Sequence, residues 1–179
     1  IGNDCYISNI STTEPTEGAT YGEGHMVSVL NEMGDGNVML FHGLNSQLAA
    51  FMVKHFRDRQ LKDGITRLIN EEIRSSQPER GTIGNGVKII NSKEITNTVV
   101  KDDCEINGAS RLSDCTILSS KDASVYIGTG VICENSIISN GCSINNSVKM
   151  QDCFVGEACQ ITNGFTAEAS VFFANSYMA

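Results

Sequence analysis

The sequence is short of positive charge and has no long apolar segment. It contains 13 Lys and Arg against 21 Asp and Glu, which gives a formal net charge of −8 and a pI near 4.8. We therefore expect neither nucleic acid nor an anionic membrane surface as a partner. No apolar run approaches the roughly 20 residues that a spanning helix needs, and no basic segment followed by an apolar one opens the sequence. We expect a cytoplasmic protein without a membrane span or a signal peptide.

Histidine is also scarce, and closely paired cysteines are missing. The three histidines are His25, His42 and His55, and none of them lies in residues 83–179. The seven cysteines include no CxxC pair, so a zinc site of the usual spacing is not expected. The sequence predicts no metal site.

A seventeen-residue repeat fills residues 83–179. Apolar residues recur at the same place in each repeat, seventeen residues apart except for one step that is four residues longer: Ile83, Val100, Ile117, Ile138, Val155 and Phe172. Inside each repeat the apolar positions follow one another at six, six and five residues, which is not a helical spacing. Each six-residue unit fits a short strand followed by a turn, and three such units make one coil. The sequence therefore predicts a triangular parallel β-helix, an all-β solenoid.

The repeat also predicts which side chains point inward. Side chains alternate across a strand, so the aliphatic residue and the residue two positions before it face the interior, as in the pair Cys104 and Ile106. Asn, Asp and Gly mark the corners because they tolerate left-handed backbone. Val, Thr or Ser replaces cysteine at equivalent inward positions of other repeats, which is typical of a small core-filling residue. We expect buried free thiols; the alternative is a disulfide between stacked neighbours such as Cys142 and Cys159.

Two segments carry a family resemblance. Ile83-Gly84-Asn85-Gly86-Val87 and Ile127-Gly128-Thr129-Gly130-Val131 resemble the hexapeptide repeat of the left-handed parallel β-helix superfamily. The resemblance implies the left-handed sense of the coil, which periodicity alone does not fix. Enzymes of that superfamily mostly transfer an acyl group from acyl-CoA or acyl carrier protein to a sugar nucleotide or an amine, with a histidine base in a groove between subunits of a trimer. It implies a transferase-like protein, with acyl-CoA or a sugar nucleotide as ligand, a small-molecule substrate and a homotrimer.

Residues 10–82 interrupt the repeat. Two β-prone runs, 25–30 and 38–41, flank a segment that holds an Asp-Gly pair, which predicts a hairpin. Asn45 follows as a helix cap, and a second helix ends at Gln77-Pro78, because the residue before proline disfavours helix. We predict a first coil at residues 1–9, an inserted α+β lobe of a β-hairpin and two helices at 10–82, and further coils at 83–179.

The lobe extends the resemblance. Val29-Leu30-Asn31-Glu32, Ser46-Gln47-Leu48-Ala49 and Arg80-Gly81-Thr82-Ile83-Gly84 are similar to an uncharacterised family of large β-helix proteins from Bacteroidetes, and the similarity covers most of the chain. In that family the β-helix continues beyond a segment like this one, so we expect the chain to be part of a longer protein. The family brings no established activity.

The candidate site residues all lie in the lobe, because the superfamily base is a coil histidine and residues 83–179 have none. The same absence excludes the three-histidine zinc site of the γ-type carbonic anhydrases, which share the fold. General-base chemistry needs a group that titrates near neutrality, so His25 and His42 are the candidate catalytic residues. Their positions at the ends of the two hairpin strands allow them to face each other.

Asn31 and Glu32 are candidate ligand-binding residues, because they recur in the resemblance at the hairpin tip. Each candidate also has a simpler interpretation: strand-end histidines often have no catalytic role, and Asn and Glu occur in ordinary turns. We interpret His55 as a packing residue on a helix.

Two functions stay open. The first is a hexapeptide-repeat transferase-like enzyme that completes its chemistry in the longer parent protein, this segment alone being inactive. The second is a non-catalytic β-helix scaffold or an oligomerisation or interaction module, which the histidine-free coils favour. No cofactor motif is evident.

Overall fold

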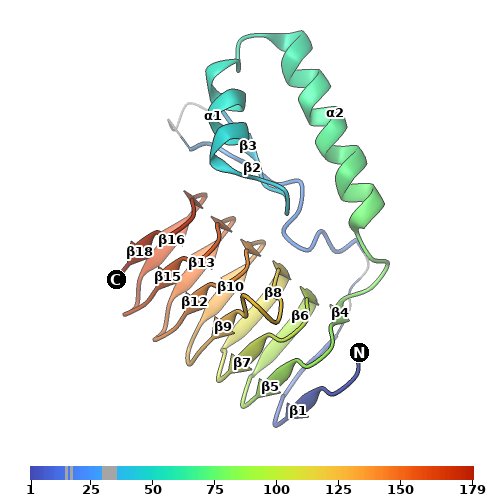
Figure 1. The fold of residues 1–179 in the computed structure, drawn as a ribbon, viewed down its shortest axis with the longest axis vertical. Coiled ribbons are helices and arrows are strands. Elements are labelled where there is room, and N and C mark those ends of the chain that lie inside the picture. The colour runs from blue at the N-terminus through green and yellow to red at the C-terminus, as the bar shows by residue number, and fades with distance from the viewer. Residues whose placement is uncertain (15, 17, 30–35) are drawn as a thin grey trace.

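The computed structural model describes residues 1–14, 16, 18–29 and 36–179. It is a parallel β-solenoid that carries, on one side, a lobe of two helices and a small antiparallel hairpin (Figure 1). The chain begins at one end of the solenoid and reaches the other end at its C-terminus. Most neighbouring strands pair seventeen residues apart, as Glu94 with Arg111, and at the longer coil they pair twenty-one apart, as Arg111 with Ile132. The predicted fold class and coil length are confirmed, while the left-handed sense stays an expectation from the resemblance.

The first face of the solenoid is a seven-stranded parallel sheet. Its strands are, in spatial order, β1 (Tyr6–Ser8), β5 (Lys88–Ile90), β7 (Glu105–Asn107), β9 (Tyr126–Ile127), β12 (Ser143–Ile144), β15 (Gln160–Ile161) and β18 (Tyr177–Met178).

The second and third faces belong to one nine-stranded parallel sheet. Strands β6 (Glu94–Val100) and β8 (Arg111–Ile117) run across both faces and turn the corner at Asn97 and Asp114, whose φ angles are 45° and 50°. The second face continues with β10 (Ile132–Glu134), β13 (Lys149–Gln151) and β16 (Thr166–Glu168), and the third with β4 (Thr82–Ile83), β11 (Ile137–Ile138), β14 (Phe154–Val155) and β17 (Val171–Phe172).

Stacked aliphatic side chains fill the interior. Ile89, Ile106, Ile127, Ile144 and Ile161 form one column of fully buried residues. The positions two residues earlier are buried too, which confirms the predicted inward pattern: Val87, Cys104, Val125, Cys142 and Cys159. All seven cysteines are free thiols, and all but Cys5 are buried, as predicted.

The lobe contains β2 (Met26–Val27), β3 (Val38–Met39), α1 (Ser46–Lys54) and α2 (Arg59–Ser76). The Asn45 side chain accepts a hydrogen bond of 2.9 Å from the Leu48 N–H, which confirms the predicted helix cap. Helix α2 ends at Ser76, and Gln77, directly before Pro78, is its C-cap with extended backbone, so the helix stops before the proline as predicted. The hairpin tip, with Asn31 and Glu32, lies outside the described residues.

The lobe leaves the solenoid within the first coil. Thr12 forms a parallel bridge with Glu94 on the second face, and β4 resumes the pairing on the third face against β6. The insertion therefore stands between two faces of one coil. The residue boundaries of the lobe at 10 and 82 stay predictions.

The corner between the second and third faces holds the segment that leads into the lobe. The Thr16 N–H donates to Oδ1 of Asn97 at 2.7 Å, and the Thr20 N–H donates to Oδ1 of Asp114, one coil further, at 3.1 Å. Both acceptors have left-handed backbone at equivalent places in β6 and β8. The corner residues thus act as turn formers and also anchor this segment.

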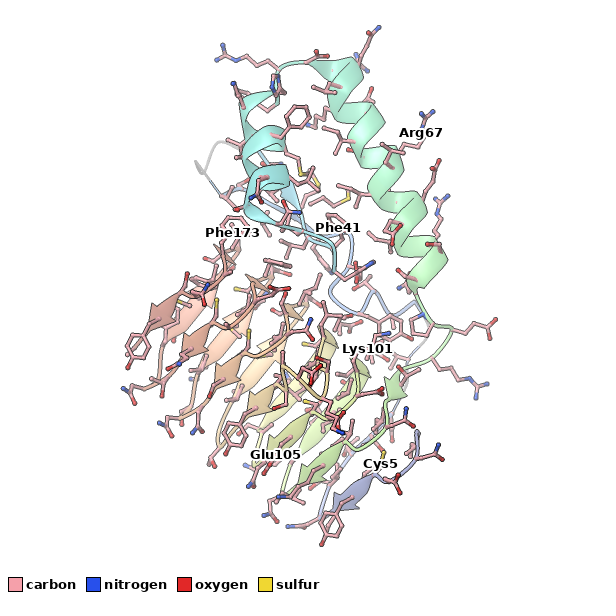
Figure 2. All side chains as sticks on the ribbon, viewed as in Figure 1. Cys5, Phe41, Arg67, Lys101, Glu105 and Phe173 are labelled. Atoms are coloured by element: carbon pink, nitrogen blue, oxygen red, sulfur yellow. The ribbon has the colours of Figure 1, made fainter. Side chains whose placement is uncertain are left out.

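The third face packs against the lobe through outward-pointing apolar residues. Ile137 and Phe154 are at most 2 % exposed and belong to one apolar cluster with Val27, Leu40 and Ile73 of the lobe. Burying a side chain of this size contributes roughly 1.5–3 kcal/mol. The lobe is therefore held by a second hydrophobic core, distinct from the interior of the solenoid. Phe173 of the solenoid and Phe41 of the lobe lie on its two sides (Figure 2).

Candidate functional site

His42, which follows β3, lies between two carboxylates. Its Nδ1 is 3.1 Å from Oε1 of Glu23, and its backbone N–H donates to Oε2 of the same carboxylate at 3.1 Å. On the other side of the ring, Nε2 is 3.4 Å from Oε1 of Glu72, on α2. The Glu23 side chain is 7 % exposed and the Glu72 side chain 56 %. A buried carboxylate at Nδ1 keeps a proton on that nitrogen and fixes the orientation of the ring.

The surroundings of His42 favour its protonated form. The hydrogen bond with Glu23 raises the pKa of His42 above its ordinary value of 6.5, while partial burial acts in the opposite direction. Glu72 raises the pKa further, as a hydrogen-bond partner and as a nearby negative charge. His42 therefore gains and loses its second ring proton, at Nε2, in a pH range above 6.5.

The structure does not bring the two candidate histidines together. Met26 pairs with Met39 in the hairpin, and the Leu40 N–H donates to the His25 carbonyl at 2.8 Å, so Leu40 stands opposite His25. The expected arrangement with His25 facing His42 is wrong, because the register places His42 next to Glu23 instead.

His25 contacts the segment before it and the solenoid. Its Nε2 is 3.1 Å from Oγ1 of Thr20, and its Nδ1 is 3.7 Å from Oδ1 of Asp152. Asp152 occupies the same corner of the solenoid as Asn97 and Asp114, three coils beyond Asn97 and two beyond Asp114. These contacts make His25 part of the attachment of the lobe.

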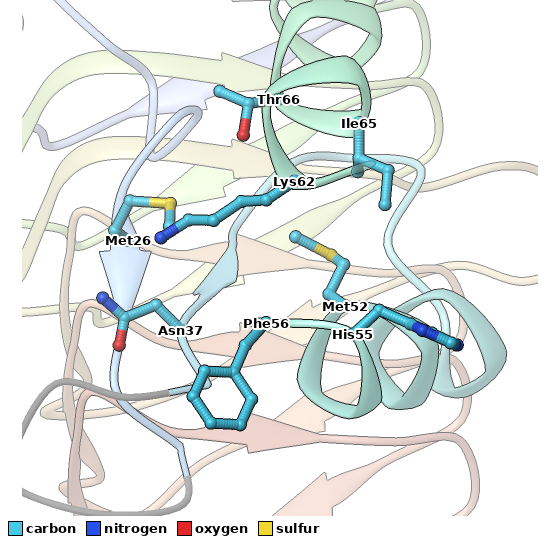
Figure 3. A pocket seen from close by; sticks show the side chains of 8 residues that line it. All are labelled: Met26, Asn37, Met52, His55, Phe56, Lys62, Ile65 and Thr66. Atoms are coloured by element: carbon cyan, nitrogen blue, oxygen red, sulfur yellow. The ribbon is translucent and has the colours of Figure 1, made fainter. Parts of the chain in front are cut away.

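His55 lies at the C-terminal cap of α1, with its ring centroid 4.6 Å from that of Phe51. It borders a small cavity inside the lobe, into which Lys62 extends toward Met26, while the His55 imidazole points away (Figure 3). The cavity has a volume of about 20 Å³, room for about one water molecule. It is too small for a substrate.

A hollow lies where the lobe meets the solenoid, and we call it the junction groove. Its volume is about 500 Å³, within the range of roughly 300–1,000 Å³ typical of small-molecule sites. Residues 42–47 of the lobe line one side, and the solenoid lines the other with Leu118, Ser139, Asn140, Phe154, Gly156, Glu157, Phe173 and Ala174. His42 is therefore at the edge of the groove with its ring already oriented.

A smaller cavity of about 60 Å³ adjoins the same histidine near the end of α2. His42 and Leu118 line both hollows, so the imidazole stands between them. The small cavity also contains Glu23, Tyr21 and Lys101, the last of which supplies a positive charge. Burial, together with the charge of Asp114, raises the pKa of Tyr21 above 10.0, so its phenol stays protonated near neutral pH.

Sequence reasoning found His42 but missed its partners. Gly22-Glu23-Gly24 is too short for a phosphate-binding loop, and nothing in the local sequence links Glu23 to a histidine nineteen residues away. The hairpin register creates the link, and the register depends on the length of the connection between β2 and β3. Glu72, on α2, is largely exposed and still reaches His42.

These observations define a class: a parallel β-solenoid with a helical lobe inserted in its first coil and a histidine-lined groove at the junction. The model of the family described as "Domain of unknown function (DUF4954)" matches residues 1–179, so the chain belongs to that family. No curated protein and no solved structure matches the chain. The expected Bacteroidetes origin stays a prediction.

The described residues include no helix that is both long and apolar enough to cross a membrane. In the same part of the chain, no three His, Cys, Asp or Glu residues are grouped so that they could hold a metal ion.

Proposed function

We propose that this chain is the substrate-binding part of a transferase-like enzyme, with the junction groove as the ligand site and His42 as the general base. The observation that supports this most strongly is the Glu23–His42 pair at the edge of a groove of about 500 Å³. A carboxylate behind an imidazole orients the ring and stabilises the imidazolium that forms when it takes a proton. The inserted lobe supplies both His42 and one wall of the groove.

In the proposed reaction, the Nδ1–H group of His42 donates a hydrogen bond to Glu23, and the unprotonated Nε2 faces a hydroxyl or amine of the substrate. The exposed Glu72 side chain moves aside to open Nε2. The nucleophile loses its proton to Nε2 and forms a bond to the acyl carbon of a thioester, and the carbon–sulfur bond breaks. The proton then passes from Nε2 to the departing thiolate. Because the pKa of His42 is raised, this chemistry requires a pH at which Nε2 is unprotonated.

The lining of the junction groove favours an acceptor without negative charge. Hydroxyl and amide side chains from both walls can hydrogen bond to it: Asn45, Ser46, Gln47, Ser139 and Asn140. Among the described residues that line the groove, none is Lys or Arg, and Glu157 adds a negative charge. A sugar hydroxyl or an amine fits this lining better than a diphosphate. Acyl-CoA and sugar nucleotides remain ligand classes proposed from the superfamily resemblance, as do the homotrimer and the cytoplasmic location.

A second candidate is a non-catalytic scaffold or interaction module. The specific observation in its favour is that both ring nitrogens of His42 already face carboxylates, Glu23 at 3.1 Å and Glu72 at 3.4 Å. In this alternative the three side chains form an ion-pair cluster that joins the segment before the hairpin, the loop after it and α2. The histidine-free coils also fit this alternative.

A thermal-shift screen separates the two functions. The chain, and the His42→Gln variant, are screened against CoA, acetyl-CoA, sugar nucleotides, free sugars and amines. A ligand that binds only the native state should add roughly 2.7 kcal/mol of stability at 100 times its dissociation constant. The proposal predicts a shift that is reduced in His42→Gln and kept in the control His55→Gln. No shift with any member of the panel, for a folded chain, supports the scaffold.

A further inference from the structure

A second, apolar hollow opens under α1, and we call it the α1 groove. Its volume is about 430 Å³, and its lining includes Val29, Val38, Ala50, Val53, Val171 and Phe173. The helix contributes small or branched aliphatic side chains, and β17 contributes the outward-pointing Val171. Ser46 and Lys54 are the only polar residues among the described residues that line this groove.

The α1 groove meets the junction groove at two residues. Ser46 and Phe173 line both hollows, so the apolar one continues from the polar one past the first turn of α1. Phe173 lies at the C-terminal end of the solenoid below the lobe (Figure 2). The walls therefore change along one continuous surface, from amides and hydroxyls beside His42 to aliphatic side chains under α1.

We propose that the two grooves together bind an amphiphile: an uncharged polar head in the junction groove and an unbranched hydrocarbon chain in the α1 groove. The location of the head rests on the proposed function, whereas the chain site follows from the α1 groove alone. Each hollow has the volume of a small-molecule site, roughly 300–1,000 Å³.

The continuity of the two hollows favours this ligand over a protein partner. Binding to an aliphatic wall is favourable when it removes apolar surface from water. The wall offers no hydrogen bond to a polar group, so burying a polar group there is unfavourable. A docked protein segment would need broad apolar contact, while here the apolar wall ends at Ser46 and gives way to amides and hydroxyls. An alkyl chain with a neutral head matches both halves.

Calorimetry with a series of alkyl β-glucosides tests the proposal on the full chain, each below its critical micelle concentration. The series runs from hexyl to decyl. Burying one methylene should strengthen binding up to about fourfold, so affinity should rise stepwise with chain length and level off once the groove is full.

The matched variants are Ala50→Arg and Ser75→Arg. Ala50 is exposed on α1 and lines the α1 groove, so arginine there blocks the groove without removing a buried side chain. Ser75 is exposed on α2 and lines neither groove. We expect the dependence on chain length to disappear in Ala50→Arg and to persist in Ser75→Arg.

The outcomes separate this inference from the proposed function. Affinity independent of chain length, or equal chain-length dependence in both arginine variants, overturns the hydrocarbon site. Dissociation of a dimer by the glucosides, seen by light scattering, also overturns it, because the α1 groove would then be an interface between copies. Chain-length dependence that persists with unchanged affinity in His42→Gln supports the hydrocarbon site and contradicts the role proposed for His42.

Discussion

The carboxylate of Glu23 contacts His42 twice, at the imidazole Nδ1 and at the backbone N–H, each at 3.1 Å. The two contacts fix both the ring and the chain that carries it. Because the Glu23 side chain is almost fully buried, water screens this pair weakly. The Glu23–His42 pair is therefore a firmly positioned acid–base group beside the junction groove.

We predict that Glu23→Gln lowers the pKa of His42. The substitution removes the negative charge that stabilises the imidazolium, and the hydrogen bond with Glu23 is the largest cause of the raised pKa. An NMR titration of the His42 ring protons measures the change. The control is Glu72→Gln, whose exposed carboxylate contributes less, so its effect should be smaller. An equal or larger effect of Glu72→Gln would contradict the account.

Stability should fall as the pH rises above 6.5. The pKa of His42 is higher in the folded chain than its ordinary value of 6.5, so protonation stabilises the fold. That stabilisation is complete below 6.5 and is lost as the pH rises through the folded-state pKa. Denaturant unfolding between about pH 6 and pH 9 should show this loss. Glu23→Gln should flatten the dependence of stability on pH. If Glu23→Gln keeps the wild-type slope, the Glu23–His42 pair is not the source of this pH dependence.

Phe154→Ala should loosen the lobe. The Phe154 side chain points out of the solenoid into the core shared with the lobe and is 2 % exposed. Replacing a buried phenylalanine by alanine costs about 3–5 kcal/mol, which denaturant unfolding can measure. Tyr177→Ala serves as control, since Tyr177 is 67 % exposed and should change stability by less than about 0.5 kcal/mol. Similar losses in both variants would show that the lobe does not depend on this contact.

Gly22→Ala should destabilise the chain more than Gly18→Ala. Both glycines have a φ of +80°, so alanine at either position carries a similar backbone cost of roughly 1–3 kcal/mol. Only at Gly22 would the added Cβ lie 2.8 Å from the Ser136 carbonyl oxygen, while at Gly18 it meets nothing within 4 Å. The difference in unfolding free energy isolates the close approach of the segment before the hairpin to the solenoid. Equal losses would mean that this approach is absent in solution.

Only Cys5 should react with a thiol reagent in the native state. Burial raises the pKa of Cys104, Cys115 and Cys142 to about 12. Burial also raises the pKa of Cys133 and of Cys153. Their thiolate fraction near neutral pH is therefore very small. Mass spectrometry after a short pulse of iodoacetamide should find Cys5 modified and the other six modified only in denaturant. Rapid native labelling of Cys133 would contradict the packed interior.

The repeat predicted the solenoid because each regular coil adds seventeen residues, and columns such as Ile89 and Ile106 record this spacing directly. The cap at Asn45 and the stop before Pro78 were also predictable, since both depend on adjacent residues.

The site was predictable only in part. His42 stood out as one of three histidines, but its pairing with Glu23 depends on hairpin register, and its position beside Leu118 depends on how the lobe docks. The docking surface did leave a trace in consecutive apolar residues, such as Ile137 with Ile138, where one side chain points inward and one outward. Such consecutive apolar residues predict that the third face is buried, but they do not predict which part of the chain packs against it.

An NMR titration of the His42 imidazole with the ligand selected by the thermal-shift screen tests the central claim most directly. The account predicts that the His42 ring signals and the amide signals of Asn45 and Asn140, on opposite walls of the junction groove, shift together with one dissociation constant. Saturating ligand that shifts signals on the first face, such as those of Glu105 and Tyr126, and leaves His42 unchanged would place the ligand site elsewhere and contradict the account.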